Sequence, residues 1–427
     1  MKTVIRPPKS HWKELAVRPL IDSRQLVGKV RSILDDVKTS GENAVRDYCL
    51  KFDAYDPSPM EIPAMEFRSA EEVLGEKLKL AIRRAARNIE LFHRNQLVEL
   101  PIVYISRSIQ CWQKDIPIER LGFYIPGGTA PLFSTVLMLG IPAKIAGCQD
   151  VIMCTPADSS GRIHPAILYA ANICGIKKVF RIGGVQAIAA MTYGTKEIRP
   201  VDKIFGPGNQ YVTLAKQLVS EEGIAIDMPA GPSELLLIAD ETADPAFVAA
   251  DLLSQAEHGA DSQVVLTCMS LTFASRVKEE LMLQVEELPR KDIALQSLIN
   301  SRIIVLESLS EMMEFSNFYA PEHLIICVKE ARKLSEDVRN AGSVFIGNYT
   351  PESAGDYASG TNHTLPTNGY ARSFSALNLQ SFMKTIQFQE IQADGLAELG
   401  PDVIEMAEAE GLQAHAQAVR MRMMKGE

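Results

Sequence analysis

Several glutamine, histidine and acidic side chains in this sequence could bind a metal ion or move a proton. The stretch LLSQAEHGADSQ at residues 252–263 places Gln255 and His258 three positions apart. At that spacing a helix would put both side chains on one face. They could be half of a metal site, or only the solvent-exposed end of an ordinary helix. A metal site here would need its other ligands from distant parts of the chain.

The segment YAPEHLIIC places Glu322 and His323 at the start of an apolar run. The run predicts a strand, and Pro321 favours an extended residue before it, so both side chains would stand at a loop-to-strand junction. A carboxylate beside an imidazole offers two bases of different strength, one to activate water and one to take an alcohol proton. The alternative is a surface glutamate next to a histidine at the beginning of a strand.

Two other polar segments carry candidate groups. PESAGDYASGTNHTLPTNG (351–369) contains Asp356 and His363, and PAGPSELLLIAD places Ser233 just before a predicted strand. Polar loops of this kind are usually solvated connectors, but they are also where binding and catalytic residues concentrate.

Near the C-terminus, Glu410 and His415 lie on either side of Gly411, which weakens the predicted helix and allows a local bend. An exposed histidine is the usual explanation for such a position. Nitrogen and oxygen ligands of these types suit zinc, with manganese or cobalt as substitutes. The candidate ligand set comprises Gln255, His258, Asp356 and His415.

Three glycine-containing stretches each follow a strand-like run and precede a predicted helix. They are FYIPGGTAPL (123–132), RIGGVQAIAA (181–190) and IFGPGNQYVTLA (204–215). Glycine at such a turn lets backbone N–H groups approach a phosphate at a helix N-terminus. None matches the GxGxxG fingerprint, and each could be only a tight turn. Three in one chain favour a nucleotide or phosphate ligand.

Most of the chain alternates short apolar runs with helical stretches, beginning at about residue 121. The apolar runs are continuous, as in strands buried on both faces of a parallel sheet, so we expect an α/β protein with crossover helices. The first 100 residues are mainly helical. The clearest helix spans residues 69–97, where Ser69 and Glu72 predict a capping box. The last 50 residues return to helix.

The composition is that of a globular protein, with 427 residues, 46% hydrophobic and 23% charged. This length predicts two or more domains. The net charge of −9 argues against a nucleic-acid partner. No apolar run is long enough for a membrane helix, and no secretory signal is recognisable. Seven scattered cysteines without CxxC spacing indicate reduced thiols, so we expect a cytoplasmic protein.

Six stretches together resemble the L-histidinol dehydrogenase family: YAPEHL, LLSQAEHG, ESAGDYASGTNH, IFGPGN, DMPAGPSE and YIPGGTAPLFSTVLM. The resemblance runs from about residue 20 to the end. It implies two incomplete Rossmann-like parallel-sheet domains with helical N- and C-terminal extensions. The expected segments are an N-terminal helical arm (1–22), a first α/β domain (23–120 plus 235–377), an inserted second α/β domain (121–234) and a C-terminal helical tail (378–427).

The resemblance also implies a reaction, the zinc- and NAD-dependent four-electron oxidation of L-histidinol to L-histidine through an enzyme-held aldehyde. This is the last step of histidine biosynthesis. By motif, one zinc ion per subunit would be held by Gln255, His258, Asp356 and His415. Glu322 would activate water and His323 would be the general base. Substrate contacts would come from Ser233, His363 and Glu410, together with His323 and the four zinc ligands. NAD contacts would come from Tyr124, Gln186 and Asn209.

The family resemblance further implies a homodimer whose C-terminal tail reaches into the partner's active site, with Glu410 and His415 across the interface. Three other readings stay open at this point. The chain could oxidise another small polar alcohol, hydrolyse a substrate with zinc and no nucleotide, or bind metal without catalysis.

Overall fold

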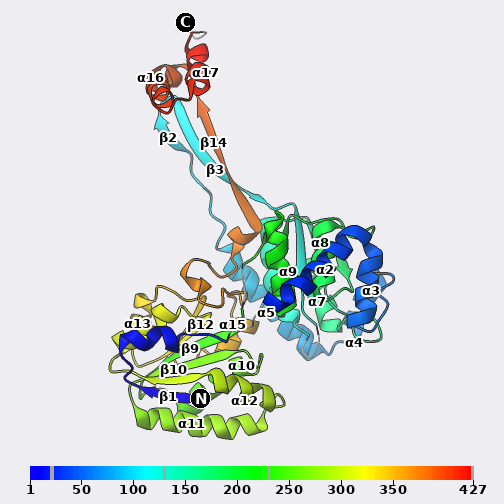
Figure 1. The fold of residues 1–427 in the computed structure, drawn as a ribbon, viewed down its shortest axis with the longest axis vertical. Helices are drawn as coiled ribbons and strands as arrows, with labels where there is room; N and C mark the ends of the chain where they lie inside the picture. Colours follow the sequence, from blue (N-terminus) through cyan, green and yellow to red (C-terminus); the bar gives the residue numbers. More distant parts are fainter. Residues whose placement is uncertain (20–23, 128–130, 229–230, 425–427) are drawn as a thin grey trace. The chain divides into compact units, whose positions relative to one another are not determined.

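The computed structural model describes residues 1–19, 24–127, 131–228 and 231–424, which form two compact units. Unit 1 comprises Met1–Gln96 and Ile118–Ser381. Unit 2 comprises Leu97–Pro117 and Phe382–Glu427. Unit 1 contains two parallel sheets, and unit 2 contains a three-stranded antiparallel sheet followed by two helices (Figure 1).

The larger sheet of unit 1 has six parallel strands in the order β1-β11-β10-β9-β12-β13. Their bounds are β1 Lys2–Ile5, β9 Glu234–Ala239, β10 Gln263–Cys268, β11 Arg302–Val305, β12 His323–Cys327 and β13 Ser343–Ile346. Neighbouring side chains of a strand point to opposite faces. Along β9, Leu235 and Leu237 belong to one core cluster, whereas Leu236 and Ile238 belong to another. Burial on both faces explains why the strand is continuously apolar.

Helices cover both faces of this sheet. Those of the first core cluster are α10 (Pro245–Ala256), α11 (Leu271–Gln284) and α12 (Lys291–Asn300). The second cluster contains Trp12 of α1 (Trp12–Leu15) and Phe315 of α13 (Leu309–Tyr319), whose rings meet edge to face at 5.3 Å. The short helices α14 (Ala331–Leu334) and α15 (Glu352–Tyr357) follow β12 and β13.

The smaller sheet of unit 1 has five parallel strands in the order β6-β5-β4-β7-β8. Its strands are β4 Arg120–Tyr124, β5 Asp150–Cys154, β6 Lys178–Phe180, β7 Lys203–Phe205 and β8 Ala225–Ile226. Its connecting helices are α6 Phe133–Ala146, α7 Pro165–Cys174, α8 Gly184–Tyr193 and α9 Gln210–Glu221. In chain order this is 3-2-1-4-5, the Rossmann order without its sixth strand. Strands β9 to β13 repeat the same order, so the prediction of two incomplete Rossmann-like sheets is confirmed.

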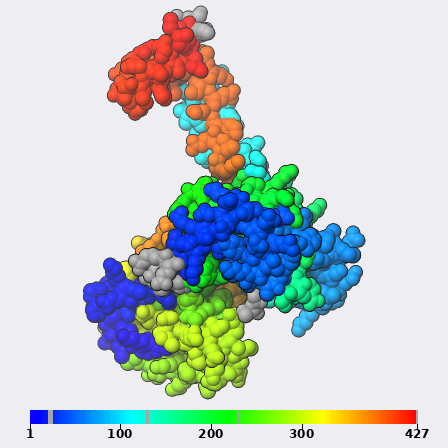
Figure 2. All heavy atoms as spheres, turned by 45° about the vertical axis from the view of Figure 1, so that its right-hand side comes forward, coloured from blue at the N-terminus to red at the C-terminus, as the bar shows by residue number. Residues whose placement is uncertain are grey.

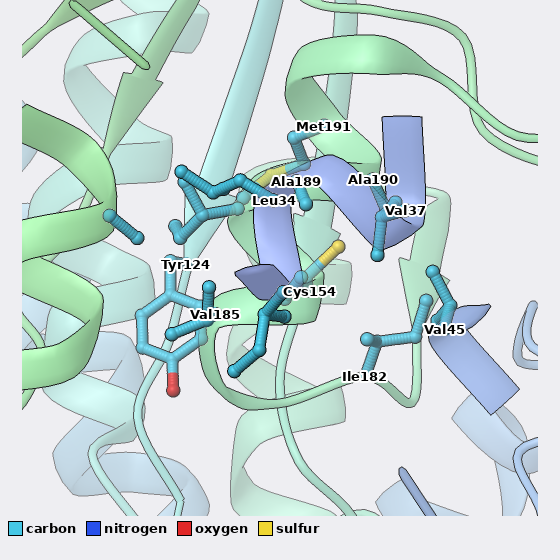
Figure 3. Close-up of a cluster of buried hydrophobic side chains, with 14 of the residues drawn as sticks. Leu34, Val37, Val45, Tyr124, Cys154, Ile182, Val185, Ala189, Ala190 and Met191 are labelled. Atoms are coloured by element: carbon cyan, nitrogen blue, oxygen red, sulfur yellow. The ribbon is translucent and has the colours of Figure 1, made fainter. Parts of the chain in front are cut away.

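The N-terminal region is helical, as predicted, except that Lys2–Ile5 forms the edge strand β1. Helix α2 (Arg24–Ser40) packs against α8 and α9, and α3 (Glu42–Phe52) packs against α8. Figure 3 shows Leu34 and Val37 of α2 among buried side chains of α8, and Tyr124 at the end of β4 belongs to the same core cluster. The blue N-terminal helices lie on the surface of this part of unit 1 in Figure 2.

The single helix predicted over residues 69–97 is wrong. The chain forms two helices, α4 (Ala64–Val73) and α5 (Glu76–Arg94). Leu74 and Gly75 between them are extended, and Gly75 is the N-cap of α5. Ser69 lies inside α4, so the capping box is also wrong. Glycine is a poor helix former, and the apolar periodicity on either side concealed the break.

Unit 2 consists of the antiparallel strands β2 (Val103–Ser106), β3 (Ile109–Pro117) and β14 (Met383–Ile391), followed by α16 (Ala393–Ala409) and α17 (Gln413–Met423). The two helices pack against each other. Gly411 between them has a φ of +75°, which confirms the predicted bend. Parts of three predicted features lie outside the described residues: the segment boundary at residues 22 and 23, residues 128–130 of the first glycine stretch and residues 229–230 of the PAGPSE segment. The four-segment domain division stays a prediction.

Among the described residues, no helix combines the length and the apolar character needed to cross a membrane.

Candidate active site

Glu322 and His323 stand at the loop-to-strand junction that the sequence predicted. His323 is the first residue of β12, and both side chains are buried. The backbone N–H of Glu234 donates to Oε2 of Glu322 at 2.9 Å. Nδ1 of His323 lies 3.2 Å from the backbone oxygen of Glu234. Because a carbonyl can only accept, Nδ1 carries the proton, and Nε2 is the basic nitrogen of the neutral imidazole.

Two carboxylates lie beside Nε2 of His323. Oδ1 of Asp356 is 3.7 Å away, and Oε1 of Glu352 is 3.8 Å away. Both acids come from α15, four residues apart, so they share one face of that helix. The three side chains form a group that could hold a metal ion, with ligand atoms all within 4.8 Å of one another.

The close approach of these groups changes their proton affinities. Burial raises the pKa of Glu352 to about 8. Burial by itself would lower the pKa of His323, but the nearby carboxylates of Glu352, Glu322 and Asp356 raise it well above its ordinary value. Burial would raise the pKa of Asp356, yet His323 and other nearby imidazoles lower it. The surrounding carboxylates therefore make His323 a stronger base than a free imidazole.

Gln255 and His258 lie at the end of α10, which packs against α15. Gln255 is in the last turn and is completely buried, and neither atom of its side-chain amide has a hydrogen-bond partner. His258 is exposed, two residues beyond the helix. It is close enough to Asp356 to lower the pKa of that carboxyl. An amide buried without partners is costly unless a ligand satisfies it, so Gln255 does not fit the reading of an ordinary helix end.

The donors available near α15 suit a borderline cation such as zinc. Unpartnered buried atoms occur in Gln255, in Nε2 of His323 and in Oε2 of Glu352. Imidazole nitrogen and carboxylate or amide oxygen are ligands that zinc accepts. The compact group of His323, Glu352 and Asp356 differs from the ligand set that the resemblance implied, and Asp356 belongs to both. The residues present therefore fit a metal ion at Asp356.

A cleft of about 550 Å³ in unit 1 connects several predicted site residues. Asn209, Ser233 and His258 all line it. Asn209 comes from the loop after β7 of the five-stranded sheet, whereas Ser233 and His258 come from segments leading into the six-stranded sheet. The cleft thus brings together one residue from each of the predicted nucleotide, substrate and metal sets. It is large enough for a small polar substrate and part of a cofactor.

Two of the predicted nucleotide contacts meet at the glycine stretch before α8. Tyr124 is the last residue of β4, and its hydroxyl accepts a hydrogen bond from the backbone N–H of Gly184 at 3.2 Å. Gln186 is buried in the first turn of α8. Its amide nitrogen donates to Oδ2 of Asp53 at 3.3 Å, and its amide oxygen has no partner.

The third predicted contact, Asn209, caps α9. Its Oδ1 accepts from the backbone N–H groups of Tyr211 and Val212, each at 3.1 Å. A side chain on Gly206, where φ is +122°, would lie 2.0 Å from the backbone oxygen of Tyr124. Close packing therefore requires this glycine whatever ligand binds. Tyr124 and Asn209 lie at the carboxyl ends of β4 and β7, where the strand order reverses, which is the usual ligand crevice of such sheets.

His363 is held by protein groups on both ring nitrogens. Its Nδ1 donates to the backbone oxygen of Asp356 at 3.0 Å, and its Nε2 lies 3.2 Å from the hydroxyl of Thr135. Because Nδ1 carries the proton, Nε2 accepts from Thr135. The imidazole therefore links the loop after α15 to the start of α6. Its predicted contact with substrate stays a prediction.

Glu410 and His415 belong to unit 2. Glu410 is the C-cap residue of α16, and His415 lies in the first turn of α17. Glu410 is exposed, and so is His415. Their membership in the site that unit 1 forms stays a prediction.

The sequence analysis did not identify Glu352 as a site residue. It lies in the same polar segment as Asp356, and the spacing of four between two acids was the available signal. That signal has meaning only if the segment is helical. Its glycine and serine content predicted a loop instead. The short helix α15 makes the two carboxylates neighbours.

Comparison with known proteins identifies the family. A model of the histidinol dehydrogenase family matches residues 17–423. The histidinol dehydrogenase of Bacteroides thetaiotaomicron is 52% identical over 423 residues, covering 99% of each chain. That of Vibrio parahaemolyticus is 49% identical over 430 residues, covering 100% of this chain and 99% of the relative.

A solved structure shows the same similarity in three dimensions. The crystal structure of histidinol dehydrogenase from Elizabethkingia anophelis has a TM-score of 0.97 at 51% sequence identity, covering 100% of this chain and 98% of that one. A match of this extent includes both parallel sheets and unit 2. The chain therefore belongs to the histidinol dehydrogenase family and is an oxidoreductase.

Proposed function

We propose that this protein oxidises L-histidinol to L-histidine in two NAD-dependent steps, with zinc bound at Asp356 and an aldehyde held on the enzyme between the steps. This is the last reaction of histidine biosynthesis. Family membership supports the substrate. The observation that best supports the chemistry is the basic nitrogen of His323, held 3.7 Å from the carboxylate of Asp356.

In the first step, His323 takes the proton of the substrate hydroxyl. An alcohol carbon gives up hydride only as its O–H proton leaves, because the electron pair of that bond forms the new C=O bond. Nε2 is free for this role, since Nδ1 donates to the backbone of Glu234. NAD would supply the acceptor for this hydride, and the product of the first step would be an aldehyde.

The second step begins with addition of water to the aldehyde. Glu322 would accept a proton from that water. His323, once it has released the first proton to solvent, can take a hydroxyl proton of the resulting diol as the second hydride leaves. The products of both steps together are one carboxylate and two reduced nucleotides. Glu322 and His323 are neighbours, 3.6 Å apart between Oε2 and Nδ1, so one site can perform both roles. Keeping the aldehyde in place prevents release of a reactive intermediate.

The proposed zinc ligands of this chain are Gln255, His258 and Asp356, with His415 as the fourth. The unpartnered amide of Gln255 and the position of His258 near Asp356 support this set. Zinc would supply a template for two substrate nitrogens and a positive charge that offsets the carboxylates around His323.

The proposed NAD contacts are Tyr124, Gln186 and Asn209. Their support is the strand order of the five-stranded sheet, whose reversal lies between β4 and β7. NAD would supply the hydride acceptor, while the protein orients it. Ser233 and His258 line the same cleft as Asn209, which supports a substrate site next to the proposed nucleotide site.

We further propose a cytoplasmic homodimer in which Glu410 and His415 complete the partner's site. Such an arrangement would explain why His415 lies in a helix of unit 2, although the other proposed zinc ligands lie in unit 1.

The test is NADH formation on adding histidinol to zinc-loaded protein. Two NADH per histidinol, lost after chelation and restored by zinc, would support the proposal. One NADH per substrate would indicate a two-electron alcohol dehydrogenase. No NADH would overturn the redox function in favour of a hydrolase or a metal-binding scaffold.

A further inference from the structure

Glu234 holds both residues of the acid/base pair through its backbone. It is the first residue of β9 and follows Ser233 directly. Its N–H donates to Oε2 of Glu322 at 2.9 Å, and its C=O accepts from Nδ1 of His323 at 3.2 Å. The backbone of this one residue therefore fixes the positions of the Glu322 carboxylate and the His323 imidazole at the same time. Any shift of Glu234 moves both groups.

The side chain of Glu234 is fixed in turn by Arg18. The carboxylate is buried, with 1% of the residue exposed, and a buried charge is tolerated only with a partner. Nε of Arg18 donates to Oε2, and Nη2 lies 3.3 Å from Oε1. The hydroxyl of Tyr319 lies 3.0 Å from Oε2. The side chain of Arg18 is itself 13% exposed, so the pair is well shielded from water.

The same guanidinium also binds the turn that leads to Glu322. Its Nη2 donates to the backbone oxygen of Tyr319 at 2.7 Å and approaches that of Ala320 at 3.4 Å. It lies over the ring of Tyr319 at 3.9 Å. The prediction of an extended residue before Pro321 is wrong, because Ala320 ends α13 with a left-handed φ of +55°. This conformation is unfavourable for a residue with a side chain and needs support from its surroundings.

We infer that Arg18 is a positioning residue for the reaction, joining the start of β9 to the turn before β12 so that Glu322 and His323 keep their relative placement. This inference rests on the proposed function. No part of Arg18 needs to touch substrate or cofactor. A guanidinium suits the task because its planar fork carries five donors and can bind a carboxylate with two nitrogens while it also reaches backbone carbonyls, whereas an ammonium has three donors at one point.

The test compares Arg18→Lys and Arg18→Met in the zinc-loaded enzyme. A displacement of about 1 Å at reacting groups lowers the rate by on the order of 100-fold, so we expect Arg18→Met to lower kcat 10- to 100-fold. The KM for NAD should stay within about twofold of wild type, because the nucleotide residues lie on the other sheet of unit 1. Arg18→Lys keeps the charge beside Glu234 and should recover kcat to within about 10-fold of wild type.

A second variant covers the case in which Arg18→Met fails to fold. Arg18→Met combined with Glu234→Gln leaves no unpaired buried charge and keeps the backbone groups of residue 234. Its kcat should still be lowered, since the carbonyl contacts at Tyr319 and Ala320 are lost. The matched control is Lys79→Met, which removes another cation that is only 8% exposed, in α5 of the same unit. It should keep wild-type kcat.

Three results would overturn the inference while leaving the proposed function intact. They are an unchanged kcat per zinc-loaded site in Arg18→Met or in the double variant, an equal loss in Lys79→Met, and a loss confined to the KM values. A wild-type protein that forms no NADH from histidinol would instead overturn the proposed function itself.

Discussion

Nε2 of His323 lies 3.7 Å from Oδ1 of Asp356. This distance brings together two residues from separate segments of the sequence, one from the acid/base pair and one from the proposed metal ligands. It also means that a cation bound at Asp356 would adjoin the basic nitrogen. Proton transfer and metal binding should therefore depend on each other in this site.

The two members of the acid/base pair should affect different steps. Glu322→Gln keeps the shape of the side chain and the oxygen that accepts from Glu234, but it removes the base that activates water. We expect the first oxidation to proceed and the second to slow by a factor of order 10² to 10⁴. His323→Asn should slow both oxidations. Single-turnover NADH formation with histidinol and with the aldehyde separates the steps. Equal slowing of both steps in Glu322→Gln would contradict the assignment.

Zinc should stabilise the folded protein, because the ligands come together only on folding. At a free zinc concentration 100 times the Kd, the expected gain is about 2.7 kcal/mol. The thermal unfolding midpoint should rise by a few degrees on adding zinc and fall on adding a chelator. His258→Ala should lose most of this shift, whereas His11→Ala, at an exposed histidine near the N-terminus, should keep it. An identical shift in both variants would exclude His258 as a ligand.

The proposed exchange of tails predicts complementation between inactive variants. His258→Ala and His415→Ala should each be inactive as pure dimers. A mixed dimer has one site with both lesions and one with neither. Random mixing of equal amounts should therefore restore about one quarter of wild-type activity. Wild-type protein diluted with a Glu322→Gln, His323→Asn double variant is the activity reference, because its activity per wild-type subunit should not change when subunits exchange. No recovery despite proven exchange would mean that His415 serves its own subunit.

Tyr124 should contribute to nucleotide binding through the loop that it holds. Tyr124→Phe removes the hydroxyl that accepts from the N–H of Gly184. One hydrogen bond contributes about 1 kcal/mol, so the KM for NAD should rise by roughly fivefold while the KM for histidinol changes little. Tyr193→Phe is the control, since that hydroxyl bonds to Glu222 at the far end of the α8–α9 pair. Equal changes in the two variants would argue against a local effect.

Asp251 should make stability depend on pH. Burial raises the pKa of this carboxyl to about 7. A raised pKa means that the folded state binds more protons than the unfolded state between about pH 4 and 7, so stability falls as pH rises through that range. Asp251→Asn should therefore stabilise metal-free protein more at pH 8 than at pH 4.5. Denaturant unfolding at both pH values measures the difference, with exposed Asp47→Asn as control. A gain that does not depend on pH would contradict this explanation.

The sequence by itself determined the fold class and much of the candidate site. Continuous apolar runs such as LLLIA predicted strands buried on both faces, because only a covered parallel sheet tolerates them. The junction at His323 and the bend at Gly411 followed from local residue types in the same way. Family resemblance supplied the identity of the reaction, which no spacing argument could reach.

Only the tertiary structure decided which distant groups meet. Glu352 is a neighbour of His323 because a glycine-rich segment forms a short helix. The helix propensity of these residues does not predict that helix, so it depends on tertiary packing. The break at Gly75 was hidden by apolar periodicity on both sides. Arg18 reaches Glu234 across more than 200 positions of sequence, and no local pattern marks such a contact. Secondary structure depends on neighbours along the chain, whereas a site depends on side chains that only the folded packing brings together.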